Sequence, residues 1–239
     1  MNVDILAIGV HPDDVELGCS GTLLKHIAMG KTVGIVDLTK GELGTRGNAE
    51  LRLQEAENAR RIMGAAVREN LGMADGFFQH NEENILKISK VIRKYKPQIV
   101  LANAISDRHP DHGRAAKLTS DACFYSGLAR IQQKNANGEV LTPWRPKAVY
   151  HYIQDHNLKA DFVVDISEHI EKKFECILAF SSQFSKGGND GPQTPISGKD
   201  FMDFMKAKNR AYARQIGVEY AEGFTVDRDL GIRNLFDLI

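Results

Sequence analysis

Two strand-length apolar segments of this chain each lead into a His-Pro-Asp sequence, and this doubled feature restricts the fold more than any other. Residues 4–10 run directly into His11-Pro12-Asp13-Asp14, and residues 98–102 lead through a short loop to His109-Pro110-Asp111-His112. A short continuous apolar run is typical of a strand that is buried on both faces of a parallel sheet. We therefore expect both polar segments to lie at the carboxyl ends of buried strands.

Strand-like and helix-like patterns alternate along the rest of the chain. Further strands are expected at 33–38, 65–71, 148–153 and 161–166, and helices at 15–29, 49–63, 83–95, 114–125, 168–179 and 201–216. This alternation with short connections predicts an α/β fold around a mostly parallel sheet with right-handed crossovers. We expect a single domain over residues 1–239, a long loop at 185–199 that covers a pocket, and a tail from residue 220 that packs on the sheet or on a neighbouring subunit.

The charge balance and the cysteines limit the classes of protein to consider. Lys and Arg together number 31, as do Asp and Glu, so net charge gives no support for a nucleic-acid partner or an anionic membrane. The three cysteines are widely spaced and form no CxxC pair, which argues against a disulfide framework and against a thiolate zinc site. No signal peptide and no run of 18 apolar residues is recognisable, so we expect a cytoplasmic protein.

The two His-Pro-Asp segments carry the residue types of a catalytic metal site. Proline keeps the residue before it extended and fits the first turn of a helix, so each His should end a strand while the following carboxylates enter a helix. A catalytic zinc site needs three N or O ligands and one open position for water. His11, Asp14, His109 and His112 are all credible ligands, which leaves Asp13 and Asp111 for proton transfer or for orienting a histidine.

Other interpretations of these segments carry less weight. An Asp at a helix start often does no more than cap backbone N–H groups, but capping alone does not explain two such segments. A metal-dependent phosphoesterase usually needs two metals, and few carboxylates lie near these loops for a second site. A Rossmann-like nucleotide- or sugar-binding protein would be expected to carry GxGxxG after the first strand, where residues 9–14 read Gly-Val-His-Pro-Asp-Asp.

The two motifs resemble those of a known family. His11-Pro12-Asp13-Asp14 with Glu16 and Gly18, and 109–113, are similar to the motifs of the LmbE-like (PIG-L) zinc-dependent N-acetylglucosamine deacetylases, and the strand positions and the Gly-rich loop 41–47 extend the similarity over most of the chain. The resemblance implies a Rossmann-like three-layer fold and a zinc ion. It also implies that His11, Asp14 and His112 bind the zinc, that Asp13 is the general base, and that His109 is the acid or oxyanion partner, oriented by Asp111. Fe²⁺ suits the same ligands, because His and Asp select weakly among first-row metals.

Within this family the chain most resembles enzymes that deacetylate N-acetylglucosaminyl-malate in bacillithiol biosynthesis. The loop 41–47, Arg52 and the segment 182–184 carry this less specific similarity. A malate group has two carboxylates, so Arg52 and Arg108 are candidate substrate-binding residues, and Glu42 is a candidate partner for sugar hydroxyls. Another N-acetylglucosamine conjugate or an oligosaccharide is the alternative substrate. The resemblance also suggests a homo-oligomer, a trimer or hexamer, that acts on a small amino-sugar conjugate.

Overall fold

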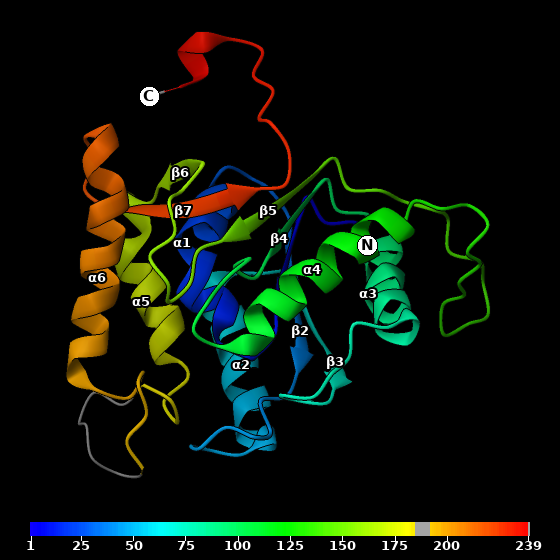
Figure 1. Cartoon of the computed structure of the whole chain (residues 1–239), viewed down its shortest axis with the longest axis horizontal. Helices are drawn as coiled ribbons and strands as arrows, with labels where there is room; N and C mark the ends of the chain where they lie inside the picture. The colour runs from blue at the N-terminus through cyan, green and yellow to red at the C-terminus, as the bar shows by residue number, and fades with distance from the viewer. Residues whose placement is uncertain (185–191, 239) are drawn as a thin grey trace.

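Seven strands form one sheet whose order is β3-β2-β1-β4-β5-β7-β6 (Figure 1). The computed structural model describes residues 1–184 and 192–238. The strands are β1 (Ile5–Gly9), β2 (Val33–Thr39), β3 (Val67–Met73), β4 (Ile99–Ala102), β5 (Ala148–Tyr152), β6 (Phe162–Asp165) and β7 (Ala221–Val226). The first five run parallel, while β7 lies antiparallel to both β5 and β6. The sheet is therefore mostly parallel, as the sequence predicts.

Helices cover both faces of this sheet and make three layers. They are α1 (Asp14–Ala28), α2 (Ala49–Met63), α3 (Glu82–Tyr95), α4 (Pro110–Tyr125), α5 (Ile170–Leu178) and α6 (Lys199–Ala213). α3 packs on α4 over one face, whereas α1, α2 and α5 pack together over the other, and α6 lies against β7 at the sheet edge (Figure 1). Apolar side chains that are almost fully buried fill the space on both sides of β1. The predicted Rossmann-like three-layer α/β fold is confirmed.

Three local predictions differ from the structure. α4 begins at Pro110 rather than at residue 114, because proline fits the first helical position and its missing N–H costs no hydrogen bond there. The tail that was expected to pack on the sheet or on a neighbouring subunit begins with β7, a strand of the sheet itself that the sequence pattern did not predict. Of the loop expected at 185–199, residues 185–191 lie outside the described residues, and α6 already begins at Lys199.

The order of the strands places the two His-Pro-Asp segments side by side. β1 lies between β2 and β4, so the chain proceeds from β1 toward one edge through β2 and β3, and toward the other from β4 onward. In open α/β sheets, ligands bind beyond the carboxyl ends of the strands where the order reverses. His11 follows β1 and His109 follows β4, so both segments lie at this position.

The helix that carries Asp14 is anchored by buried ion pairs. Glu16 of α1 accepts a hydrogen bond of 2.6 Å from the Arg68 guanidinium, which also holds Asp37 of β2 at 2.7 and 2.9 Å. Burial acts to lower the pKa of Arg68, but the carboxylates of Asp37 and Glu16 more than offset it and raise that pKa. One turn further along α1, Glu222 of β7 accepts the backbone N–H groups of residues 21 and 22 and pairs with the fully buried Lys173 at 2.7 Å. These contacts connect α1 with β2, β3, α5 and β7.

The remaining segment after β7 extends away from the body of the protein (Figure 1). Its apolar side chains are exposed: Leu230, Ile232, Leu235, Phe236 and Leu238.

All three cysteines are buried and free. Among the described residues, no helix combines the length and the apolar character that a membrane crossing requires.

Removing the cation of the first ion network should destabilise the fold. Arg68→Met leaves Glu16 and Asp37 buried without a partner, so we expect a loss of about 3–5 kcal/mol in the free energy of unfolding, measured by denaturant titration. Arg61→Met is the control, because Arg61 pairs with Glu57 on the surface with its side chain 67% exposed and should change stability by less than about 1 kcal/mol. Equal effects of the two substitutions would contradict a stabilising role for the buried network.

Candidate metal centre and active site

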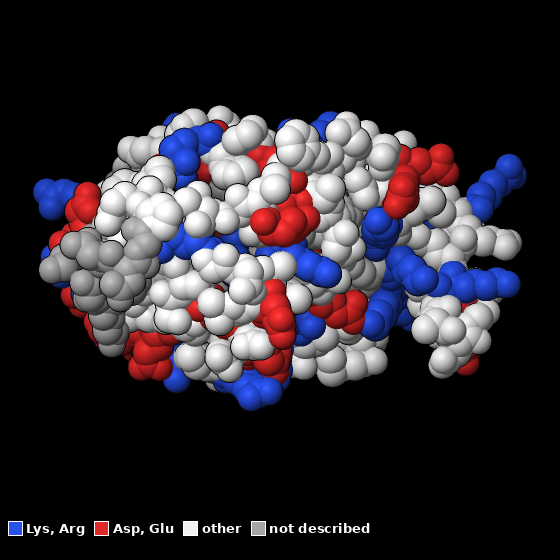
Figure 2. Space-filling view, turned by 90° about the horizontal axis from the view of Figure 1, so that it is seen from below, with Lys and Arg blue, Asp and Glu red and all other residues white. Residues whose placement is uncertain are grey.

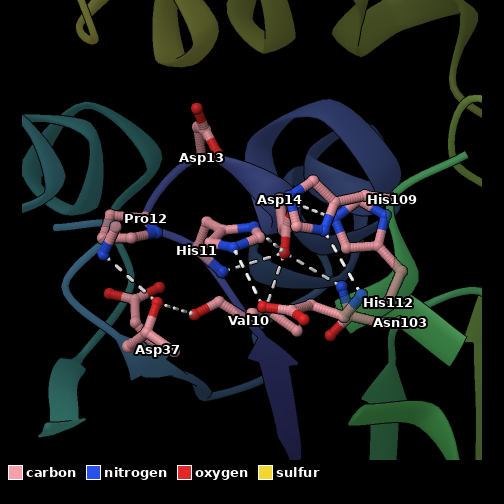
Figure 3. A network of polar contacts seen from close by, with 12 residues as sticks. Val10, His11, Pro12, Asp13, Asp14, Asp37, Asn103, His109 and His112 are labelled. Atoms are coloured by element: carbon pink, nitrogen blue, oxygen red, sulfur yellow. Dashed lines mark hydrogen bonds and ion pairs between the residues drawn. The ribbon is translucent and has the colours of Figure 1, made fainter. Parts of the chain in front are cut away.

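The Asp14 carboxylate is the centre of the polar contacts between the two motifs (Figure 3). Its Oδ2 accepts the backbone N–H groups of Val10 and His11, both at 2.9 Å, and the side-chain amide of Asn103 at 3.0 Å. Gln154 donates to its Oδ1 at 3.1 Å. Gly9 allows this packing, because a Cβ there would lie 3.0 Å from the Asp14 Cβ. The end of β1 and the start of α1 therefore fix one carboxylate in place.

Two imidazoles flank Asp14, and each has a second carboxylate behind it. His112 Nε2 lies 3.2 Å from Asp14 Oδ1, and His11 Nδ1 lies 3.6 Å from Asp14 Oδ2. The opposite ring nitrogens face Asp107, at 2.5 Å from His112 Nδ1, and Asp75, at 3.0 Å from His11 Nε2. A metal-binding histidine usually has such a partner on its other nitrogen, which fixes the tautomer. The donor set His11, Asp14 and His112 therefore fits a divalent metal.

The third imidazole lies close to the other two. The His109 ring stacks on His112 with centroids 5.1 Å apart and meets the edge of His11 at 4.7 Å. Nitrogens of His11, His109 and His112 all lie within 4.8 Å of one another, as do ligand atoms of a second group, His11, Asp75 and Asp111. The structure therefore offers alternative ligand sets around His11, but only His11 and His112 combine contact with Asp14 and a carboxylate on the other nitrogen.

The relation between His109 and Asp111 differs from the expected one. His109 Nδ1 faces the backbone N–H of Asp111 at 3.3 Å, as the N-cap of α4. The Asp111 carboxylate accepts from the Gly76 N–H at 2.9 Å and from Arg114 at 3.0 Å, and lies 3.8 Å from His11 Nε2. The backbone of residue 111, rather than its carboxylate, therefore contacts the His109 ring.

The carboxylates and imidazoles around Asp14 shift one another's pKa values strongly. Burial acts to lower the pKa of His112, but Asp14 and Asp107 raise it to about 9, and the acids around His11 likewise raise the pKa of that ring well above its usual value. Burial would raise the pKa of Asp14, yet the two imidazoles hold it well below its usual range. The pKa of His109 is lowered, first by burial and then by the charges of the other two rings. The surrounding carboxylates therefore favour the protonated, positively charged forms of His11 and His112 beside Asp14. A divalent metal ion that binds here would displace these two protons.

Asp13 differs from Asp14 in backbone and environment. Its φ of 134° lies in a region that non-glycine residues rarely adopt, and such strain is often found at functional positions. Figure 3 shows its carboxylate directed away from the imidazoles, and Arg52 Nη2 donates to it at 3.1 Å. Burial raises the pKa of Asp13 to about 7, although the Arg52 charge opposes this. A carboxylate with that pKa exchanges protons readily near neutral pH.

The three residues expected to bind substrate have different positions. Arg108 lines the cavity above the imidazoles and pairs with Asp155 at 2.6 Å. Arg52 also lines it, but donates to Pro12 O at 2.8 Å and to Asp13, so it supports the motif from within the protein. Glu42 is exposed and is not among the described residues that line the cavity, because its carboxylate accepts the backbone N–H groups of Asp75 and Lys40. The contact of Glu42 with sugar hydroxyls therefore stays a prediction, without support from the described lining of the cavity.

The cavity has a volume of about 350 Å³, which is within the range of small-molecule sites. His11, Asp13, Asp14, His109 and His112 all line it. Figure 2 views the protein from below the orientation of Figure 1, the side toward which β2 and β3 run, and acidic and basic side chains are interspersed over the middle of this face. The middle of this face therefore carries charges of both signs around the strand ends.

The cavity lining includes residues that the sequence motifs did not indicate, among them Asp75, Asp107, Gln154 and Lys208. Asp75 follows β3 and Gln154 follows β5, so the rule that located the two motifs at strand ends could have indicated both. Asp107 lies two residues before His109 and could have been found by proximity. Lys208 comes from α6, and the sequence carries no signal that this helix returns to the site.

Comparisons with known proteins agree with this geometry. A family model described as PIG-L, GlcNAc-PI de-N-acetylase, matches residues 6–123. The diacetylchitobiose deacetylase of Thermococcus kodakarensis is 31% identical over 190 residues, which cover 75% of this chain and 70% of that protein. A probable N-acetyl-α-D-glucosaminyl L-malate deacetylase 2 of Bacillus anthracis is 25% identical over 76% of this chain and 81% of its own. The conserved protein TT1542 of Thermus thermophilus superposes with a TM-score of 0.85 at 34% identity, covering 97% of this chain and 98% of its own.

The carboxylate behind His112 should strengthen metal binding. Asp107→Asn keeps an oxygen for the backbone N–H groups of residues 155 and 156 but removes the charge that orients the ring, so we expect zinc affinity to fall about 10–100-fold. Asp155→Asn is the matched control at the rim of the same cavity and should change affinity by less than about twofold, since its carboxylate pairs with Arg108. Competition with a chromogenic chelator measures the zinc affinity of both variants. Equal affinities of Asp107→Asn and Asp155→Asn would argue against a role for Asp107.

Proposed function

The chain belongs to the PIG-L (LmbE-like) family and is a hydrolytic N-acetylglucosamine-conjugate deacetylase, and on this premise we propose that it works with one zinc ion bound by His11, Asp14 and His112. The observation that carries the proposal is the position of Asp14 between two imidazoles, each with a carboxylate on its far nitrogen. The three side chains face a cavity that also holds Asp13 and His109. Fe²⁺ remains an alternative occupant of the same ligands.

The reaction consumes water and an acetamide and gives acetate and a free amine. A bound zinc ion would supply Lewis acidity and would lower the pKa of a water molecule to about 7. Asp13 is the proposed general base, which takes one proton from the attacking water. Its pKa of about 7 suits this role, and Arg52 holds the carboxylate at the cavity wall.

His109 is the proposed acid. In its protonated form it would stabilise the negative charge on the carbonyl oxygen and then donate a proton to the departing nitrogen. Stacking on His112 and the backbone N–H of Asp111 hold the ring over the cavity. We propose that Asp111 supports the site through its contacts with Gly76, Arg114 and His11, although it was expected to orient His109 directly.

The group that is attached to the amino sugar of the substrate has two candidates. Malate, as in N-acetylglucosaminyl-L-malate, is the candidate from the sequence motifs, and Arg108 at the cavity rim is the cation that supports it. A second sugar, as in an oligosaccharide, is the alternative, and the relative from Thermococcus kodakarensis carries the name of such an enzyme. A cytoplasmic location remains part of the proposal.

The role of Asp13 can be separated from metal binding. Asp13→Ala removes the proposed base but none of the proposed ligands, so we expect zinc content to stay at the wild-type level while kcat falls about 10²–10⁴-fold. Amine release from acetylated amino sugars, together with metal analysis of the same preparation, measures both quantities. Asp121→Ala is a control, since this carboxylate pairs with His80 and Lys117 on the surface and should leave kcat unchanged. Activity of Asp13→Ala near the wild-type level would exclude Asp13 as the base.

A further inference from the structure

The cavity has one polar end and one apolar wall. The polar end holds the three imidazoles and Asp14, while the wall comes from the segment that leads into α6 and from the first turns of that helix. Its side chains are Pro195, Ile196, Phe201, Phe204 and Met205. The sequence predicts a pocket-covering loop at 185–199 and a helix from residue 201, and the family model that matches residues 6–123 does not include this region.

The wall is held in place by packing. Phe201 stacks on Phe184 with ring centroids 5.8 Å apart and nearly parallel planes, and Met205 is 4% exposed. Phe204 lies 6.2 Å from the Phe201 ring but remains 41% exposed, so it presents an apolar surface to the cavity. An aromatic face that is fixed and open to solvent is suited to packing against the C–H face of a sugar ring.

Charges in the cavity do not favour an anionic group. Among the residues that the structure describes, five carboxylates line it (Asp13, Asp14, Asp75, Asp107 and Asp155), against three Arg and Lys side chains (Arg52, Arg108 and Lys208). With a divalent metal ion bound, the formal charges of these side chains and of the ion would sum to zero. Malate would add two negative charges to a site that has no surplus of cations.

The three cations are also engaged within the protein. Arg52 donates to Asp13 and to backbone carbonyls. Lys208 donates to the carbonyl oxygens of Ile153 and Gln154. The Arg108 side chain is 45% exposed, and its Nε pairs with Asp155. Recognition of a second carboxylate by Arg52 would require its contacts to be exchanged, at the cost of leaving Asp13 without its cation.

We propose that the apolar wall formed by residues 195–205 is the subsite for the group attached to the reacting amino sugar, and that this group is an uncharged sugar ring. The ring would pack one C–H face on Phe204, while its hydroxyls stay at the solvent-exposed mouth of the cavity. This inference rests on the proposed deacetylase function and selects, within it, a neutral amino-sugar disaccharide over a malate conjugate.

Amine release from two substrates tests the inference directly. The zinc-loaded protein is assayed with N,N′-diacetylchitobiose and with N-acetylglucosaminyl-malate, and we expect kcat/KM to be at least about tenfold higher for the disaccharide, as one apolar contact can supply. A higher kcat/KM for the malate conjugate overturns the subsite inference and leaves the deacetylase function standing. Absence of amine release from both substrates overturns the function and the inference together.

Substitution of the wall identifies the residue responsible. Phe204→Ala should lower kcat/KM for the disaccharide about tenfold, mainly through KM, and Phe204→Tyr should restore most of it, because the ring face is retained. Phe236→Ala removes a phenylalanine that is 92% exposed on the C-terminal segment and serves as the matched control. Thermal unfolding confirms that each variant is folded. If Phe204→Ala and Phe236→Ala have the same kcat/KM for the disaccharide, the wall is not the subsite.

Discussion

The arrangement of the site depends on one buried carboxylate, that of Asp14, and on the two backbone N–H groups that hold it. Val10 and His11 donate to the same oxygen, so the turn from β1 into α1 and the position of the carboxylate determine each other. Asn103 and Gln154 bring the ends of β4 and β5 to the same group. Three strands thus converge on one anion, which is stable in a buried position because each contact is a hydrogen bond or an imidazole.

The buried charges beneath the site are likewise each met by an opposite charge or a hydrogen-bond donor. Glu16 is two residues from Asp14 and meets Arg68, and Glu222 receives Lys173 together with backbone N–H groups of α1. Each of these pairs joins elements that are distant in the sequence. Such ion pairs add little stability compared with apolar side chains in the same place. They restrict the position of α1, because a shift of this helix would leave charges unpaired in the interior. The network therefore fixes the helix on which Asp14 lies.

The sequence predicted the sheet, the position of the two motifs and their convergence, because buried parallel strands and X-Pro segments are determined locally. It predicted neither β7, whose buried Glu222 is met by Lys173 of α5 and by backbone N–H groups of α1, nor the approach of Lys208 and Phe204 from α6. It also did not indicate that Glu42 closes its loop by accepting the backbone N–H of Asp75. These misses share one cause, since each depends on contacts between segments that are far apart in the sequence, which no local pattern encodes.

We propose that a single divalent metal between His11, Asp14 and His112 makes the deacetylase active, and metal titration of the apoprotein can establish whether it does. Metal is removed with a chelator, zinc is added back in measured steps, and amine release from N,N′-diacetylchitobiose and from N-acetylglucosaminyl-malate is followed. We expect activity to be lost on metal removal and to return linearly up to one equivalent of zinc per chain. Full activity of the apoprotein, or a requirement for two equivalents, would contradict it.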